Sequence, residues 1–578
     1  MDTKGSLPTE SHSQVNTFSQ DAKAAIDKSI QTLQAHKKEW AELPVKEYVE
    51  FIEQISQAIA DCADEWALLD MQNRGIDPNH WDAVTSYFVC PILALRMTRS
   101  YQRTLEDIIK YGKPRIPGPV TTMANGQVAV GVFPVDSYDK IIFHGFTSEV
   151  WLDPGIKADN IPSAVRYNGK PLDPKVSLVL SAGNVSSTTV GDVLLKLFNE
   201  RNVVMIKTHP VLKYTPNIYK KIFKPLIERG FIQIVEGGIP ETDYIVHHAD
   251  VEEIHMTGSD KTFDALLYGT GEQGRTNKAQ RNPILKKKIA GELGNISPLI
   301  VVPGPWSEQE LTYQADNIAG SIMSYCGFFC LTTRVIIQHA SWDLRKPLLE
   351  KLRAVFANTP NTVAHYPGAE QRLKKIIEQH PESEKYGQFT EKETPWTFVA
   401  DLQSSNTNDP CFNTEIFGSF SSETTIAANS IPEYIDKAVE FCNQQLWGTL
   451  SATIIIHPSS LQDEKIKAAV ERAKSNLRYG TICINSPTGI SYLMSTNIWG
   501  GYPGSPDYDI QSGNVHVNNA YMLEHTQKTV TTGPFKISPK PSWLPSNKKS
   551  ANIVRKLLDF EKHNSVWNLI RILVASTI

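Results

Sequence analysis

The chain has 578 residues, more than one ordinary hydrophobic core organises, so two or more packed units are expected. Apolar residues make up 41% of the sequence and charged residues 21%, a composition typical of a globular protein rather than a disordered one. The net charge is −4 and no basic stripe carries interleaved aromatic residues, which argues against nucleic acid as a partner.

The sequence shows no signal peptide or membrane-spanning stretch, and its cysteine pattern indicates a reducing environment. Residues 1–20 are polar, lack the apolar core of a signal peptide, and are predicted to be a disordered lead. No stretch approaches the roughly 18 apolar residues that a membrane-spanning helix needs. The seven cysteines are scattered, which suits a reducing compartment such as the cytoplasm. Cys326 and Cys330 have no second Cys or His pair nearby, so no metal site is expected.

Residues 21–110 are predicted to be helical, because apolar residues recur there every three or four positions. The recurring residues in the clearest stretch are Tyr48, Phe51, Ile52, Ile55, Ala58 and Ile59. Residues 111–170 are rich in Pro and Gly and show no clear period, so no element is assigned to them.

From residue 174 the pattern changes to alternating strands and helices. Short apolar runs predict strands at residues 176–180, 203–206, 231–235 and 254–256. The helix between the second and third strands should have Thr215 as its N-cap, Pro216 at its first position, and its end at Gly230. Such alternation predicts a parallel sheet covered by helices on both faces.

The alternation resumes after residue 297. A strand is predicted at residues 298–302, and the next helix begins at Ser307, where Glu310 completes a capping box. That helix runs down toward Cys330, and a strand at residues 334–338 follows at once. Cys330 is therefore expected between a helix end and a strand, where a side chain can face a cleft.

Five short segments, in order along the chain, resemble motifs of the aldehyde dehydrogenase superfamily. They are NVVMIKTHP (202–210), IHMTGS (254–259), GELGN (291–295), GFFC (327–330) and TEIFGS (414–419). Each is weak alone, but their order and spacing together indicate the family over roughly residues 174–485. The resemblance implies an α/β fold with two doubly wound open sheets, one for the cofactor and one for catalysis, plus an oligomerisation segment.

The resemblance also implies a division of the chain. Residues 21–291 would form the N-terminal helices and the nicotinamide cofactor-binding domain, and residues 292–490 the catalytic domain. Residues 491–535 would close the fold and mediate assembly into a homo-oligomer, a dimer or a tetramer. Residues 536–578 remain as a proline-rich linker and a helical extension.

The same resemblance assigns three catalytic roles. Cys330 would be the nucleophile that forms a thiohemiacetal and then a thioester with an aldehyde substrate. Glu292 would be the general base for hydrolysis, and Asn184 would stabilise the oxyanion together with the backbone N–H of Cys330. The structural alternatives are a small buried cysteine, a solvated glutamate, and a turn residue following Gly183.

Cofactor contacts are implied at Lys207, which ends a strand, at Gly258 and Ser259, which open a helix, and at Glu415 and Phe417, which would meet the nicotinamide ribose and ring. The cofactor is NAD or NADP. Where many family members carry a carboxylate that favours NAD, this chain has Pro210, so a 2′-phosphate is not repelled there.

Several departures from the family leave other functions open. Phe328 and Tyr325 replace a Gln and an Asn near the nucleophile, so a catalytically silent binding or structural member is one alternative. A second alternative is an acyl-CoA reductase. The presence of Glu292 argues against this alternative. The Gly-rich stretch at residues 269–274 matches G-x-G-x-x-G but lacks a preceding strand, so it is interpreted as an exposed loop.

The last 25 or so residues carry apolar positions at helical spacing, among them Val554, Leu557 and Leu558. We expect this extension to dock on its own or a neighbouring subunit. The alternative is a basic amphipathic helix lying on an anionic membrane surface.

Overall fold

The computed structural model describes residues 18–577, so the predicted lead at residues 1–20 lies almost entirely outside the described residues. Helix α1 (Gln20–Glu42) begins within that predicted lead, because the Ser19 hydroxyl caps it by accepting the Ala22 N–H at 3.1 Å. The helical N-terminal region is confirmed. Its remaining helices are α2 (Val45–Arg74), α3 (Ala83–Tyr87), the π-helix Phe88–Ile92 and α4 (Leu93–Tyr111).

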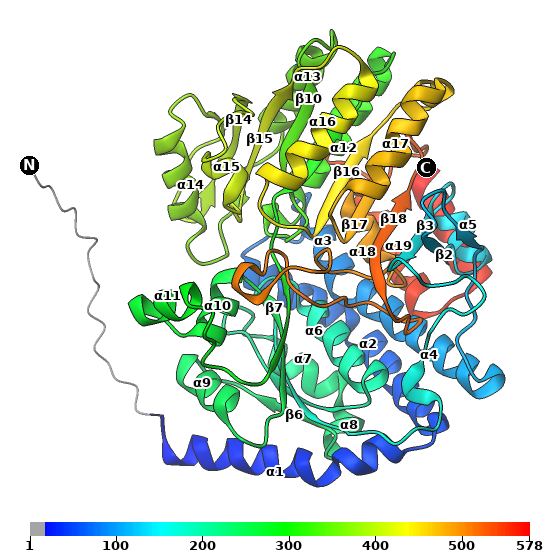
Figure 1. The fold of residues 1–578 in the computed structure, drawn as a ribbon, viewed down its shortest axis with the longest axis vertical. Coiled ribbons are helices and arrows are strands. Elements are labelled where there is room, and N and C mark those ends of the chain that lie inside the picture. Colours follow the sequence, from blue (N-terminus) through cyan, green and yellow to red (C-terminus); the bar gives the residue numbers. More distant parts are fainter. Residues whose placement is uncertain (1–17, 578) are drawn as a thin grey trace, which may run out of the picture.

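Two sheets organise the rest of the chain (Figure 1). The smaller one is wholly parallel, in the order β6-β5-β4-β7-β8, as the strand–helix alternation predicts. Its strands are β4 (Val176–Leu180), β5 (Val203–Lys207), β6 (Ile232–Val235), β7 (Glu253–Gly258) and β8 (Lys288–Leu293). The strand order reverses beside β4, and ligands bind parallel α/β sheets at such a switch point, outside the carboxyl ends of the strands.

Six helices connect and cover this sheet together with the π-helix Leu195–Asn199. They are α6 (Ser186–Leu194), α7 (Thr215–Ile222), α8 (Lys224–Glu228), α9 (Ile239–His247), α10 (Asp260–Tyr268) and α11 (Gly271–Ala279). The single helix predicted from Thr215 is broken at Phe223, because Pro225 has no N–H to continue it.

The interpretation of residues 269–274 as an exposed loop is wrong, since α11 begins at Gly271. These glycines form a tight turn between α10 and α11. A Cβ atom at Gly274 would collide with the carbonyl oxygen of Gly269. The glycine spacing therefore serves close backbone approach between two helices and no phosphate loop.

The larger sheet has eleven strands, in the order β1-β2-β3-β18-β17-β16-β9-β10-β15-β14-β12. Its edge strand β12 (Glu384–Tyr386) pairs antiparallel with β14. Its parallel centre consists of β9 (Ser297–Val301), β10 (Thr333–His339), β14 (Trp396–Leu402), β15 (Phe420–Ile426), β16 (Ser451–Ile455), β17 (Thr481–Ile484) and β18 (Thr526–Thr532). Successive residues of β9 face opposite sides, as strand geometry requires: Leu299 and Val301 join one core and Ile300 joins another.

Four long helices cover the two faces of this sheet. Helices α12 (Glu308–Met323) and α13 (Arg345–Asn358) pack on one side, and α16 (Ile431–Gln445) and α17 (Glu464–Asn476) on the other. The predicted capping box of α12 is present, with both the Ser307 and the Glu310 contacts formed.

Three strands come from the range that showed no clear period. They are β1 (Val120–Thr122), β2 (Val128–Phe133) and β3 (Thr147–Leu152). The sequence grouped them with the cofactor domain of residues 21–291, but β3 pairs antiparallel with β18 and so extends the larger sheet. The strand β18, with which β3 pairs, lies hundreds of residues away, so the local pattern carries no sign of this pairing.

The C-terminal extension forms α19 (Ser550–Lys562) and α20 (Val566–Thr577). Helix α19 packs against α3, the π-helix Phe88–Ile92 and α4. The fully buried carboxylate of Glu561 anchors it, accepting from Arg96 at 2.9 Å and pairing with Arg99. Within residues 18–577, no helix is long and apolar enough to cross a membrane.

Breaking this anchor should loosen the extension. Glu561→Ala leaves Arg99 without its buried partner and Arg96 with Asp139 alone, and loss of one member of a buried pair costs about 3 kcal/mol. Hydrogen exchange should show α19 losing protection before the two sheets do. Lys562→Gln is the matched control, because its partner Asp64 is 65% exposed, and it should change stability by less than about 0.5 kcal/mol. Equal protection of α19 in both variants would contradict this role.

Candidate active site

The loop that carries Cys330 has an unusual backbone. Helix α12 ends at Met323, and in the turn Ser324–Gly327 both Tyr325 (φ 55°) and Cys326 (φ 57°) adopt the left-handed conformation. Side-chain-bearing residues adopt this conformation at a cost, and it persists where surrounding contacts enforce it. The turn reverses the chain so that Cys330, which is half-buried, faces a cavity just before β10.

A buried polar network enforces the turn. The Arg74 guanidinium is fully buried and pairs with Asp82, and its Nη1 lies 3.7 Å from Asp70. Asp82 accepts the backbone N–H of Tyr325 at 2.9 Å, and Asp70 accepts the Tyr325 hydroxyl at 2.9 Å. Cys326 lies in the same network, with its Sγ 3.5 Å from Arg74, so it is fixed away from the cavity.

Asn184 lies beside the Cys330 loop, at the start of the segment leading from β4 into α6. Its side-chain Nδ2 donates to the carbonyl oxygen of Phe328 at 2.9 Å. Its own carbonyl oxygen accepts the Tyr325 hydroxyl at 2.8 Å. An amide nitrogen has two hydrogens, so one N–H of Asn184 remains for a ligand in the cavity that both Asn184 and Cys330 line.

Glu292 stands in β8 and is 4% exposed. Burial raises its pKa to about 8, and the hydrogen bond that Trp499 Nε1 donates to Glu292 Oε1 at 2.9 Å opposes that rise. The carboxyl group also interacts with the Cys330 thiol. Near neutral pH this group exchanges a proton readily, as a general base must.

The Cys330 thiol is held in its protonated form. Burial raises its pKa well above the usual value, and the nearby carboxylates of Glu292 and Glu415 raise the pKa further. A thiol of this kind becomes a nucleophile only if a base accepts its proton. Glu292 is placed to do so.

Glu415 and Phe417 lie on the segment that precedes β15. Glu415 packs directly over Gly294, where a Cβ atom would collide with the carboxylate. Burial raises the pKa of Glu415 to about 7, and its Oε1 has no hydrogen-bond partner within residues 18–577. Phe417 packs against Phe328, with ring centroids 5.5 Å apart. The unpartnered oxygen is a ready acceptor for a ligand hydroxyl.

Gly258 and Ser259 join β7 to α10, and the Ser259 hydroxyl caps the helix by accepting the Thr262 N–H at 3.2 Å. Lys207 differs from these residues, because it does not line the cavity. Its ammonium donates to the backbone carbonyls of Thr208, at 3.1 Å, and Gly237, at 2.5 Å, and it is 5% exposed.

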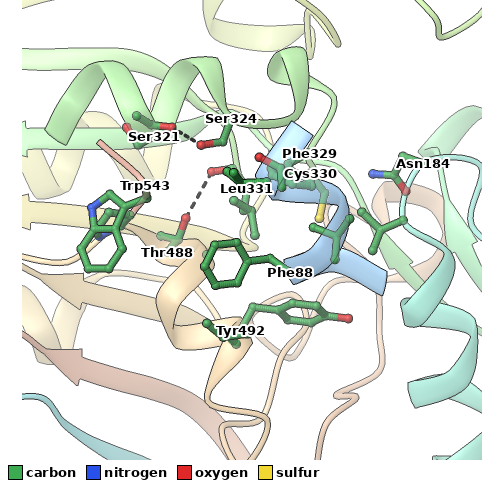
Figure 2. A pocket seen from close by; sticks show the side chains of 18 of the residues that line it. Phe88, Asn184, Ser321, Ser324, Phe329, Cys330, Leu331, Thr488, Tyr492 and Trp543 are labelled. Atoms are coloured by element: carbon green, nitrogen blue, oxygen red, sulfur yellow. Dashed lines mark hydrogen bonds between the residues drawn. The ribbon is translucent and has the colours of Figure 1, made fainter. Parts of the chain in front are cut away.

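One cavity of about 1340 Å³ joins seven of the eight residues singled out in the sequence. The seven are Cys330, Glu292, Asn184, Gly258, Ser259, Glu415 and Phe417. Figure 2 shows part of its lining, with Cys330 and Asn184 among the labelled residues. Carboxylates, a thiol, an amide and a helix N-terminus therefore converge on one space. That set can bind an extended ligand, activate a thiol and move a proton.

Sequence reasoning missed most of the aromatic residues that line the cavity, among them Trp499, Tyr492 and Tyr366. Trp499 and Tyr492 pack edge to face, with ring centroids 5.0 Å apart, beneath Glu292. Tyr366 occupies the space beside Gly183, where a Cβ atom would lie 2.8 Å from the tyrosine hydroxyl. The only available signal was the glycine itself, which stands where the family has an aromatic residue.

Within the described range, the metal-type side chains that come together are His380, Asp409 and Cys411. They lie outside the Cys330 cavity. His380 already pairs through its two ring nitrogens with Asp409 at 3.2 Å and Glu382 at 3.0 Å. These contacts account for the cluster as a structural ion-pair group.

Solved structures of known proteins share this fold, and three examples illustrate it. Aldehyde dehydrogenase 21 from Physcomitrella patens, in complex with succinate, is 14% identical over 88% of this chain and 90% of its own, with a TM-score of 0.59. Lactaldehyde dehydrogenase from Escherichia coli is 15% identical over 88% and 91%, with a TM-score of 0.58. PnpE in complex with nicotinamide adenine dinucleotide is 17% identical over 89% and 91%, with a TM-score of 0.57.

The family itself is shown by sequence. The model of the aldehyde dehydrogenase family matches residues 190–526, which is more than half of the chain. The chain therefore belongs to the aldehyde dehydrogenase family and is an oxidoreductase of that type. No curated protein sequence matches it significantly. Asn184 and the C-terminal extension lie outside the matched range.

The hydrogen bond from Trp499 gives a test of the role of Glu292. Trp499→Phe removes the donor that lowers the pKa of Glu292, so the pKa should rise. If the carboxylate form is the active one, turnover increases as pH rises through about 8, and the variant should move that limb upward by roughly half to one pH unit. Trp447→Phe is the control, since Trp447 lines the cavity without donating to Glu292. An unmoved limb in Trp499→Phe would separate Glu292 from the pH dependence.

Proposed function

We propose that the protein oxidises an aldehyde to a carboxylate through covalent intermediates on Cys330, with NAD or NADP as hydride acceptor. The observation that carries the proposal is the buried Glu292 carboxyl group beside the Cys330 thiol, with a free N–H of Asn184 facing the same cavity. Family membership supports the reaction class.

Acylation begins with proton transfer. Glu292 takes the thiol proton, and the thiolate sulfur attacks the aldehyde carbon, so a C–S bond forms as the C=O π pair moves to oxygen. The spare N–H of Asn184 and the backbone N–H of Cys330 stabilise that oxyanion. When the carbonyl re-forms, the carbon releases a hydride and a thioester remains on Cys330.

Hydrolysis of the thioester uses Glu292 a second time. After it has released the thiol proton to solvent, the carboxylate takes a proton from water as the water oxygen attacks the thioester carbon. The C–S bond then breaks, the carboxylic acid leaves, and the sulfur regains its proton. A carboxyl group whose burial raises its pKa to about 8 can accept and return protons in both steps.

The residues of the cavity fit a nicotinamide dinucleotide. The unpartnered Oε1 of Glu415 suits a ribose hydroxyl, and the N-terminus of α10 at Gly258 and Ser259 suits a pyrophosphate. The chemistry that a bound nicotinamide supplies is acceptance of the hydride. Lys207, buried against two carbonyl groups, contributes to this site only if its side chain turns away from them.

Cys330→Ala tests the nucleophile. Reduced cofactor should no longer form in the presence of aldehyde, because no thioester can arise, while cofactor binding measured by fluorescence should persist. Cys326→Ala is the matched control, since Cys326 is buried in the Arg74 network and does not line the cavity. Full turnover by the Cys330 variant would contradict the mechanism.

Glu292→Gln tests the base. Loss of a general base slows steady-state turnover by about 10²–10⁴-fold. Because Glu292 takes the thiol proton as well as activating water, rapid mixing should reveal no burst of reduced cofactor in this variant. A burst that matches the enzyme concentration would show that Glu292 serves hydrolysis alone. Added coenzyme A provides the second arm, because efficient thioester transfer to it in the unmodified protein would indicate an acyl-CoA-forming enzyme instead.

A further inference from the structure

The outer wall of the Cys330 cavity comes from the C-terminal extension. Residues 542–552 contribute most of it, and Arg555 in α19 adds to it. This segment lies beyond residue 526, where the match to the family ends. The wall is therefore a property of this chain and not of the shared family sequence.

Specific contacts hold this segment against α12. Trp543 Nε1 donates to Asn317 Oδ1 at 3.0 Å, and the backbone N–H of Ser546 donates to Asp316 Oδ1 at 3.2 Å. At Gly320, a Cβ atom would crowd the carbonyl oxygen of Trp543, so a glycine permits the close approach. The position of the wall is fixed by side chains on both sides of the contact.

The space between this wall and Cys330 is lined in part by large apolar side chains, among them Phe88, Leu331 and Trp543. Figure 2 shows Trp543 and Asn184 at opposite ends of the labelled set, with Phe88, Leu331 and Cys330 between them. The hydroxyl groups nearby are occupied. Ser321 donates to the Ile318 carbonyl at 2.7 Å, Ser324 to the Gly320 carbonyl at 2.7 Å, and Thr488 to the Leu331 carbonyl at 3.2 Å.

Two cationic residues of the C-terminal extension belong to the wall of the cavity. Lys548 and Arg555 line the cavity, and within residues 18–577 neither has a carboxylate within salt-bridge distance. Lys556 and Lys562, also in α19, do have such partners, in Asp559 and Asp64. The carboxylates that line the cavity are Asp260, Glu292 and Glu415. Glu292 is the proposed general base, and the other two lie among the residues proposed to hold the cofactor.

Lys261 and Arg372 also line the cavity. Lys261 follows the proposed pyrophosphate residues in α10, and Arg372 donates to the backbone carbonyls of Pro367 and Phe417. Lys548 and Arg555 are thus the cations of the wall that are left available for an anion.

We propose that the substrate is an aldehyde with an extended apolar body and an anionic group at its far end, of which an ω-oxo fatty acid is the simplest form. The aldehyde lies at Cys330, the apolar body lies along Phe88, Leu331 and Trp543, and the anion meets Lys548 and Arg555. Burial of the chain provides binding energy that a short aldehyde lacks. This inference rests on the proposed aldehyde oxidation.

A substrate series tests the class. We expect kcat/KM to rise at least about 10-fold from propanal to decanal and about 10-fold again to 10-oxodecanoate, with the differences carried mainly by KM. Equal kcat/KM for all three would overturn the inference while leaving aldehyde oxidation intact. No oxidation of any aldehyde, with cofactor binding retained, would instead overturn the proposed function.

Variants of the full-length chain locate the anion site. Lys548→Gln and Arg555→Gln should each raise KM for 10-oxodecanoate about 10-fold and leave KM for decanal unchanged, since only the anion loses a partner. Lys562→Gln is the matched control, because Lys562 pairs with Asp64 and does not line the cavity. Lys548 is exposed, so its variant should fold even if Arg555→Gln, which loses the contact over the Tyr87 ring, does not.

Trp543→Ala tests whether the apolar body of the substrate lies along Trp543. It should raise KM for decanal and 10-oxodecanoate together by about 10-fold and leave KM for propanal unchanged. If none of the three variants raises KM for 10-oxodecanoate more than Lys562→Gln does, the extension plays no part in substrate selection.

Discussion

The buried ion pair between Arg74 and Asp82 is the interaction on which the catalytic loop depends. Taking a guanidinium out of water is costly, and the cost is offset only where its donors are matched by carboxylates and hydroxyls. Asp82, Asp70 and Ser86 supply those partners. The same carboxylates then bind the backbone and side chain of Tyr325, so the left-handed turn before Cys330 is stabilised by the charges that satisfy Arg74.

That arrangement ties the Cys330 loop to the N-terminal helices. Arg74 ends α2, Asp82 precedes α3, and Tyr325 follows α12, which packs on the larger sheet. The Tyr325 hydroxyl bridges Asp70 and the backbone of Asn184, so the residue proposed for the oxyanion and the residue proposed for attack share one support. The two departures from the family near the nucleophile have structural partners here: Tyr325 joins this network and Phe328 packs on Phe417.

Local pattern was sufficient for much of this fold. Short apolar runs identified the strands of the parallel sheet, apolar spacing of three to four residues identified its helices, and the Ser307–Glu310 pair marked the start of α12. Motif order brought seven of eight predicted site residues to one cavity. The features that the sequence did not predict depend on long-range contacts. Tyr325 and Asp82 are 243 residues apart, β3 pairs with β18, and the Lys207 side chain turns onto the carbonyl of Gly237.

The origin of the cavity wall has a consequence for biosynthesis. Every strand of both sheets is complete by Thr532, and the residues that close the cavity, 542–555, emerge from the ribosome only afterwards. A growing chain can therefore assemble both cores while the cavity is still open to water at one side. Proteolysis or premature termination after residue 535 would leave the sheets with all their strands and remove the wall. The same loss would take α19 out of the core around the N-terminal helices and leave Arg96 and Arg99 without Glu561, so the opening of the cavity and the loss of stability would come together.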